Sequence, residues 1–315
     1  MHRFLIWSSF ILFFLTLLSP APARGCACGC GMFDVQEPME LPAQTAAQLP
    51  ARPGGMVALE YDFINQNRDW NGASRGSDGN NGDKILRTHF VTAEAQYMVS
   101  RQWGFSGEVP VWNRYFLTSD NNGNLVSYNH TALGDIRLRA IYTGISDDMS
   151  SGLTFGTKLP TGDYTSPGYD RDSEIGTGST DLLVGAFHRG AVSDDQDWQW
   201  FVNAVWDQPV LMAAQYRPGA EFNGLAGASY GGLKFSGMTL TPLAQLVESI
   251  RMRDSGTFAS APASGYARLL GVPGLVLDAS KLRFTASVGL PIAQFFNGDQ
   301  LVAGEYFKFS VGCGF

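Results

Sequence analysis

Apolar and polar residues alternate one by one in segment after segment of this chain. In one segment, Val91, Ala93, Ala95 and Tyr97 are separated by single residues that are mostly polar. Segments 135–142 and 282–290 repeat the pattern. Successive side chains of a β-strand point to opposite faces, so this period of two predicts strands with one apolar and one polar face.

The chain has no apolar run of membrane-spanning length after its first 23 residues, which excludes a helical membrane protein. Charged residues make up only 16% of the chain, against about 25% in soluble domains. An antiparallel transmembrane β-barrel fits both facts, because its strands are apolar only on the side that faces lipid. The fold class that we predict is therefore all-β.

We expect about twelve strands in this barrel. They are predicted at residues 55–65, 84–98, 102–116, 131–145, 151–160, 179–190, 197–209, 220–232, 235–249, 264–274, 281–292 and 303–315.

The predicted links between strands alternate between short and long. Short links are expected near Ser100, Asp147, Asp194, Ser236 and Asp278. Long polar links are expected at residues 65–83, 118–130, 161–178, 210–219, 250–263 and 293–302. Outer-membrane barrels have short periplasmic turns and longer external loops, so the alternation favours this class and places both chain ends in the periplasm.

The final predicted strand carries the most specific signal. Glu305, Phe307, Phe309, Val311, Cys313 and Phe315 share one face, and Phe315 ends the sequence. A terminal aromatic residue after apolar residues at every second position resembles the C-terminal insertion signal of bacterial outer-membrane barrels. The resemblance implies recognition by the barrel-assembly machinery, with outer-membrane lipid around the barrel.

The first residues have the pattern of a secretory signal peptide. Arg3 precedes an apolar run over residues 4–18, and Ala21-Pro22-Ala23 fits a cleavage site. We therefore expect a signal peptide at 1–23, a Cys- and Pro-containing periplasmic segment at 24–54 and the barrel at 55–315. The expected location is the bacterial outer membrane.

Three cysteines follow the predicted cleavage site, at Cys26, Cys28 and Cys30. Three thiolates so close together can bind one soft metal ion, Cu(I) or Zn, or serve a periplasmic redox or metal partner. Disulfide bonds are an equal alternative in a secreted chain. Lipid attachment at Cys26 is a third reading, although Arg24 is unusual in such a signal.

The polar face of the predicted strands carries charges that would line the barrel lumen. These are Glu60, Asp62, Glu94, Glu108, Arg114, Asp135, Arg137, Arg139, Lys158, Asp207, Arg283 and Lys308. A barrel of twelve strands lies between small barrels filled by side chains and wide porins. Both a narrow passage and a packed lumen are therefore compatible with the sequence.

Short motifs surround two of these charges. Leu133-Gly134-Asp135 opens one segment, residues 158–163 read KLPTGD, and residues 175–181 read IGTGSTD. These motifs resemble those of the outer-membrane transporters grouped as the phenol meta-pathway (MetA-pathway) family. The resemblance implies a transporter-like barrel for small, partly apolar compounds.

Several function classes are disfavoured. The net charge is −7 without a basic run, which argues against nucleic acid as a partner. No catalytic triad can be assembled around His89, His130 or His188, so we expect no enzyme. The favoured hypothesis is a transporter or channel for small, aromatic or apolar permeants. The alternative is a barrel that anchors a metal-binding or redox segment.

Overall fold

The computed structural model describes residues 54–77, 81–120, 122–192 and 197–315, which form fourteen β-strands and one short 3-10 helix. The strands are β1 (Gly54–Gly72), β2 (Ser74–Arg75), β3 (Asp83–Met98), β4 (Trp103–Ser119), β5 (Leu125–Leu133), β6 (Ile136–Tyr142), β7 (Ser151–Leu159), β8 (Ser179–Ala191), β9 (Trp198–Met212), β10 (Glu221–Tyr230), β11 (Leu233–Phe235), β12 (Met238–Arg251), β13 (Tyr266–Ala279) and β14 (Leu282–Gly314). The 3-10 helix η2 covers Ala261–Ala263. Among these residues, no helix is both long and apolar enough to cross a membrane.

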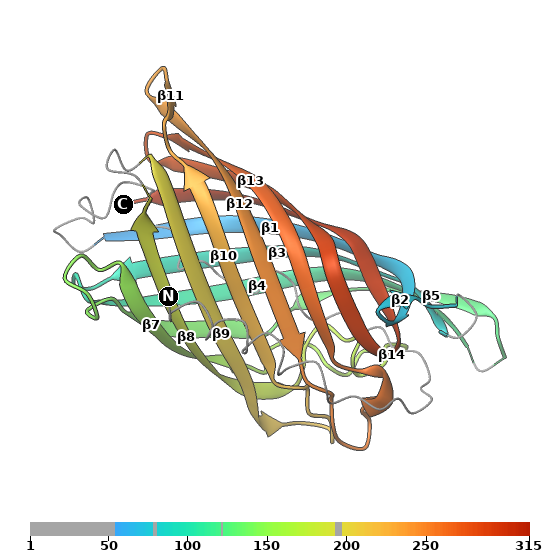
Figure 1. The fold of residues 1–315 in the computed structure, drawn as a ribbon. Helices are drawn as coiled ribbons and strands as arrows, with labels where there is room; N and C mark the ends of the chain where they lie inside the picture. Colours follow the sequence, from blue (N-terminus) through green and yellow to red (C-terminus); the bar gives the residue numbers. More distant parts are fainter. Residues whose placement is uncertain (1–53, 78–80, 121, 193–196) are drawn as a thin grey trace, which may run out of the picture.

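The strands form one closed antiparallel barrel, as predicted (Figure 1). Within the described residues, eleven elements follow one another around the ring in the order β10, β9, β8, β7, β6, β4, β3, β1, β14, β13 and β12. Pairing of β10 with β12, from Glu221 opposite Arg251 to Ser229 opposite Leu243, closes the ring. Closure leaves no free edge in the ring, which is the condition for a sheet to span a membrane.

Strand β14 crosses the barrel twice. Its first part pairs with β13 and its last part with β1, and Phe296 lies opposite both Tyr266 and Gly72. The two ends of β14 meet again at one end of the barrel, where the Gly314 N–H donates to the Lys281 carbonyl over 3.1 Å. Ten elements therefore cross once and β14 twice, which gives the twelve crossings expected from the sequence.

The prediction of a long polar loop at residues 293–302 is wrong. This stretch belongs to β14, and the chain reverses near Gly298, whose φ is +68°. Phe296 and Val302 are buried with Tyr266 in one apolar cluster, and Leu301 is buried in another. The gain from burying these side chains holds both arms of the reversal in the sheet.

The predicted strand 131–145 is also wrong in detail, because it is two elements. Strand β5 begins at Leu125, inside the predicted loop 118–130, and pairs only with β4. Strand β6 resumes at Ile136 after a break at Gly134 and Asp135. As a result, β5 and the end of β4 project beyond the barrel at the end opposite the C-terminus (Figure 1).

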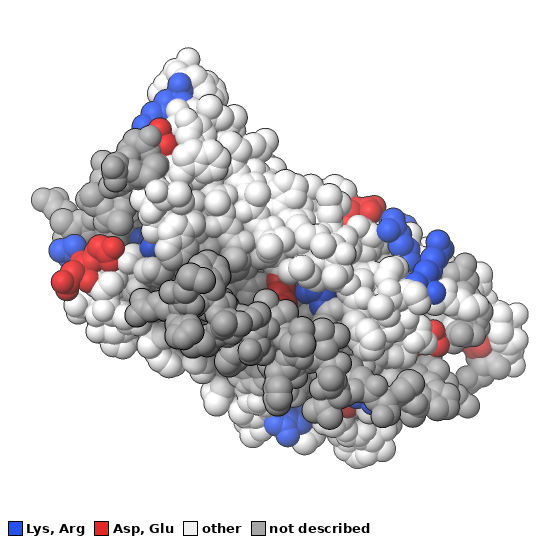
Figure 2. All heavy atoms as spheres, in the orientation of Figure 1, with Lys and Arg blue, Asp and Glu red and all other residues white. Residues whose placement is uncertain are grey.

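The two faces of the sheet separate as the alternation predicts. On the last strand, Phe307, Phe309 and Phe315 are 45%, 48% and 67% exposed on the outside, whereas Tyr306 is 3% exposed. Other outward apolar side chains include Val57, Leu59, Val91, Tyr97, Val109, Leu138, Phe155, Val184, Leu246, Leu275 and Leu290. Figure 2 shows a broad surface over the strands with few charged side chains, most of which lie toward the two ends.

One barrel end, here called the turn end, has the chain end Phe315 and tight turns such as that between Ala279 and Leu282. The opposite end, here called the loop end, has the longer connections. Outward aromatic rings gather at the turn end, where Trp103 packs on Tyr142 at 4.7 Å and Trp198 on Tyr230 at 5.0 Å between ring centroids. Rings at this position are typical of the interfacial girdle of a membrane barrel.

A charged substitution on the outer face tests this assignment of faces. Val184 lies mid-strand in β8 and is 48% exposed. We expect Val184→Arg to lower the free energy of unfolding in lipid vesicles by about 2–4 kcal/mol, because the cation would face hydrocarbon. Ser74→Arg, on an exposed residue beyond the barrel wall, serves as the control. Equal stability of both variants would contradict an outward-facing lipid surface.

Candidate functional site

The charged residues predicted for the lumen all lie on strand positions that face the interior or in the break before β6. Near the wall formed by β1 and β14, the Lys308 Nζ lies 2.9 Å from Glu60 Oε1 and 3.9 Å from Asp62 Oδ1. Near the turn end, Arg283 pairs with Asp278 through two hydrogen bonds of 2.8 and 3.1 Å. These cations are paired inside the barrel, which offsets the cost of burying them.

A second group of charges lies on the wall formed by β4, β6, β7 and β8. Glu108 on β4 forms an ion pair with Arg139 on β6 and lies 3.8 Å from Arg137. Lys158 on β7 forms an ion pair with Asp181 on β8. In the sequence, Asp181 stands out only as the last residue of the motif at 175–181. Its place directly across from Lys158 in the register makes it a lumen residue.

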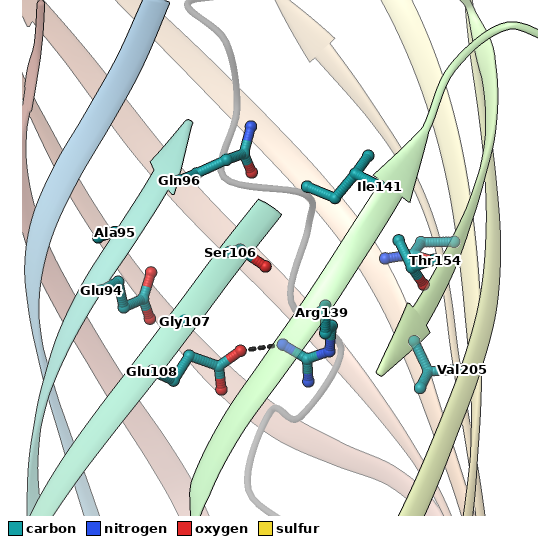
Figure 3. Close-up of a pocket in the computed structure, with 11 residues that line it drawn as sticks. Glu94, Ala95, Gln96, Ser106, Gly107, Glu108, Arg139, Ile141, Thr154 and Val205 are labelled. Atoms are coloured by element: carbon teal, nitrogen blue, oxygen red, sulfur yellow. Dashed lines mark hydrogen bonds and ion pairs between the residues drawn. The ribbon is translucent and has the colours of Figure 1, made fainter. Parts of the chain in front are cut away.

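Glu94, Glu108 and Arg139 line a small cavity inside the barrel (Figure 3). Gln96 and Ser106 complete its polar side, with Thr154 and Asn203 on the facing strands. The cavity volume is about 20 Å³, which is enough for a water molecule. The Gln96 Oε1 atom is buried without a protein hydrogen-bond partner, so a water molecule is its natural partner.

An apolar layer lines the inner wall on the loop-end side of this cavity. Its side chains come from strands that are neighbours around most of the ring, from β9 and β10 through β12, β13, β14, β1 and β3 to β4. The layer consists of Ile64, Phe90, Leu225, Val247, Leu270, Val272, Ala303 and Tyr306, with Trp112 and Phe201 packed against it. The alternation pattern predicts strands for these residues but no apolar layer. These apolar residues occupy inward-facing strand positions that otherwise carry polar residues, and this is the sequence signal that could have revealed them.

The connection between β7 and β8, residues 160–178 and here called the mouth loop, folds into the loop end of the barrel. Ser173 is fully buried and Ile175 is 1% exposed. Arg114, on the inner face of β4, donates from Nη1 to the carbonyls of Ser173 and Glu174 over 2.7 and 2.6 Å, and from Nε to Thr88 over 3.0 Å. A buried guanidinium thus holds the mouth loop against the wall.

The motifs on which the family resemblance rests come together at the base of the mouth loop. Asp135 accepts hydrogen bonds from the Gly162 N–H at 3.0 Å, the Thr177 N–H at 2.9 Å and the Thr177 hydroxyl at 2.6 Å. A Cβ added at Gly176 would lie 2.3 Å from the Gly162 carbonyl carbon, so only glycine allows this contact. Asp135 therefore ties both ends of the mouth loop to the break before β6.

Two further connections contact the mouth loop. The Tyr216 hydroxyl donates to Asp254 over 2.7 Å, and Arg251 pairs with the same carboxylate over 2.8 Å. The Arg171 guanidinium of the mouth loop lies 4.7 Å from the centre of the Tyr216 ring. Three connections at the loop end are thus linked by contacts that the alternation pattern could not predict.

Burial changes the acidity of carboxyls in the mouth loop. It raises the pKa of Glu174 to about 7, with the neighbouring Asp163 adding to the rise and Arg171 and Arg114 opposing it. Burial likewise raises the pKa of Asp172 to about 7. For that carboxyl, Asp254 on the β12–β13 connection adds to the rise and Arg251 opposes it.

Closure of the mouth loop should therefore depend on pH. A carboxyl whose pKa is higher in the closed than in the open loop favours closure once it is protonated. This stabilisation is complete below the ordinary pKa of about 4 and is lost as the pH rises through about 7. We expect conductance in planar bilayers to be about tenfold higher at pH 8 than at pH 5. Glu174→Gln should flatten the curve, and a fall in conductance with rising pH would contradict the assignment.

Other predicted residues lie apart from this site. Cys26, Cys28 and Cys30 lie outside the described residues, so their role in metal, redox or disulfide chemistry stays a prediction. His188 lies on the outer face, where its Nδ1 is 2.8 Å from the Ser151 hydroxyl and its ring packs on Trp200. Cys313 lies on the outward side of β14 and has no disulfide partner among the residues that the structure describes.

No family model and no curated protein sequence matches this chain. Its structure is similar to that of an outer membrane channel from Pseudomonas putida F1, with a TM-score of 0.62 at 12% identity, over 84% of this chain and 96% of that one. The β domain of the Bordetella autotransporter BrkA is more distant, with a TM-score of 0.45 at 12% identity over 83% and 99% of the two chains. The toluene transporter TodX of Pseudomonas putida has a TM-score of 0.40 at 10% identity over 94% and 98%. The first likeness defines the fold as that of an outer-membrane β-barrel.

Proposed function

We propose that this protein is an outer-membrane transporter for small, predominantly apolar or aromatic compounds. The observation that carries the proposal is the apolar layer on the inner wall, which contains Phe90, Trp112 and Phe201 together with Leu225 and Val247. Ion-conducting porins have a polar, water-filled interior. A layer of aromatic and aliphatic side chains instead favours solutes that lose little on leaving water.

The charges on either side of this layer support the same reading. Lys158 and Arg139 are both neutralised by carboxylates, so the lumen presents few unpaired charges to a permeant ion. The similar channel from Pseudomonas putida supports a transport role for this fold. In this reading the turn end faces the periplasm and the mouth loop faces outward, in keeping with the motif resemblance to the phenol meta-pathway family.

The test is solute uptake into vesicles whose outer leaflet contains lipopolysaccharide, which slows passage of apolar solutes through lipid. Refolded protein would be compared with protein-free vesicles for toluene, a simple phenol and a sugar. We expect uptake of both aromatic solutes above background, and of the sugar close to background. Sugar uptake as fast as that of the aromatic solutes would overturn the proposal in favour of a general pore.

The role of Cys26, Cys28 and Cys30 is a separate proposal, in which they bind Cu(I) or zinc as thiolates. Metal analysis of the mature chain, with the triple serine variant as the control, tests it. Equal metal content in both proteins would contradict it.

A further inference from the structure

Tyr169 of the mouth loop fills a site in the barrel wall at the loop end. The site, here called the aromatic slot, is formed by Leu86, Phe116, Leu301 and Tyr128. The Tyr169 ring stacks on Phe116, with centroids 5.5 Å apart and an angle of 26° between the planes, and lies 5.9 Å from the Tyr128 ring. Leu86 and Phe116 are fully buried and Leu301 is 1% exposed, so these three walls exclude water.

The aromatic slot also contains one hydrogen-bond acceptor. The Tyr169 hydroxyl donates to the Arg114 carbonyl over 2.8 Å. Burial raises the pKa of Tyr169 to about 12, so the phenol stays protonated and remains a donor. An apolar space with a backbone acceptor at this position is complementary to an aromatic ring that carries one hydroxyl.

Tyr169 reaches the slot from a loop, whereas the side chains that form the slot come from strands β3, β4, β5 and β14. The preceding Gly168 has a φ of +89°, and a Cβ there would lie 2.2 Å from the Tyr128 ring. This glycine lets the mouth loop pass close to the Tyr128 ring just before Tyr169 enters the slot. Tyr169 itself is only partly buried, so part of its side chain remains accessible to solvent.

We propose that the aromatic slot is a binding site for small aromatic solutes that carry one hydroxyl, and that Tyr169 occupies it as an internal ligand. The role of this site depends on the proposed transport function, but binding to it can be measured without transport. A solute that displaces Tyr169 removes one of the contacts that hold the mouth loop. Because Arg114 binds Tyr169 through its carbonyl and the loop backbone through its side chain, solute binding and loop release are coupled at one residue.

The first test is calorimetric binding of 4-methylphenol, which is the tyrosine side chain without its backbone, to the full chain in detergent. Tyr169→Ala should bind 4-methylphenol about tenfold more tightly than the wild type, because no internal ligand has to leave. It should bind toluene about tenfold more weakly than 4-methylphenol, because toluene cannot donate to the Arg114 carbonyl. Tyr164→Ala, in the same loop but outside the slot, should bind like the wild type. Tyr169→Phe, which keeps the ring, should fall between the wild type and Tyr169→Ala.

The second test shows whether displacement occurs in a chain that keeps Tyr169. With 3-fluorotyrosine at position 169, adding 4-methylphenol should move the fluorine resonance toward that of an exposed tyrosine, whereas toluene should have little effect. An unmoved resonance at saturating 4-methylphenol, or Tyr169→Ala binding no tighter than the wild type, would overturn the proposal. Displacement of Tyr169 without solute uptake in vesicles would support the binding site but contradict the transport function. Solute uptake without displacement of Tyr169 would support the transport function but contradict the binding site.

Discussion

Asp135→Ala is expected to lower the free energy of unfolding by about 3 kcal/mol. Asp135 is 6% exposed and accepts three hydrogen bonds from Gly162 and Thr177. Its carboxylate also lies 3.9 Å from the buried Lys158 ammonium. The substitution leaves buried N–H and O–H donors without an acceptor and removes part of the negative charge around Lys158.

The measurement is reversible unfolding by urea in lipid vesicles, followed by tryptophan fluorescence. Asp147→Ala removes a carboxylate from an exposed turn and should change stability by less than about 0.5 kcal/mol. Asp135→Asn should lower the free energy of unfolding less than Asp135→Ala does, because an amide oxygen still accepts hydrogen bonds. If Asp135→Ala lowered the free energy of unfolding no more than Asp147→Ala does, the contacts of Asp135 with the mouth loop would not stabilise the barrel.

Arg114→Ala is expected to raise the conductance of the barrel by about a hundredfold. Each hydrogen bond from a charged donor contributes about 1.5–3 kcal/mol, and Arg114 makes two to the mouth-loop backbone. Losing about 3 kcal/mol of closure raises the population of open loops by about two orders of magnitude. Single-channel recording would show longer open times with an unchanged conductance of the open channel, because the barrel wall itself is intact.

Arg87→Ala provides the matched control for this experiment. Arg87 lies on β3, the neighbouring strand, and its guanidinium stacks 5.8 Å from the Tyr115 ring. The Arg87 side chain faces the outside of the barrel, so its removal should leave the mouth loop closed. Equal conductance of both variants would mean that the mouth loop does not limit passage.

The sequence predicts the barrel well because the period of two is a local property of each strand. The charges from Glu60 to Lys308 face the lumen for the same reason, since one register fixes every second side chain. The break before β6 and the extra length of β5 could not be predicted. They depend on Asp135 turning toward Gly162 and Thr177, which are distant in sequence.

Closure of the mouth is non-local in the same way. Arg114 binds carbonyls that lie 59 and 60 residues further along the chain. The mouth loop has the glycine, proline and aspartate content of any exposed connection, and nothing in that composition indicates insertion into a lumen. The apolar layer is closer to predictable, because Phe90 and Leu225 occupy inward positions where polar residues are the rule for an open channel.

The central claim is that small aromatic solutes pass through the apolar layer inside the barrel, and blocking that layer tests it most directly. After replacement of the four native cysteines by serine, Leu225→Cys places a thiol in the layer, and Ala226→Cys places one on the outer face of the same strand. Solute uptake into vesicles would be measured before and after reaction with a bulky thiol reagent. We expect uptake to fall to background for Leu225→Cys and to be unchanged for Ala226→Cys. Unchanged uptake after complete modification of Leu225→Cys would contradict it, because the solute would then be crossing by another route.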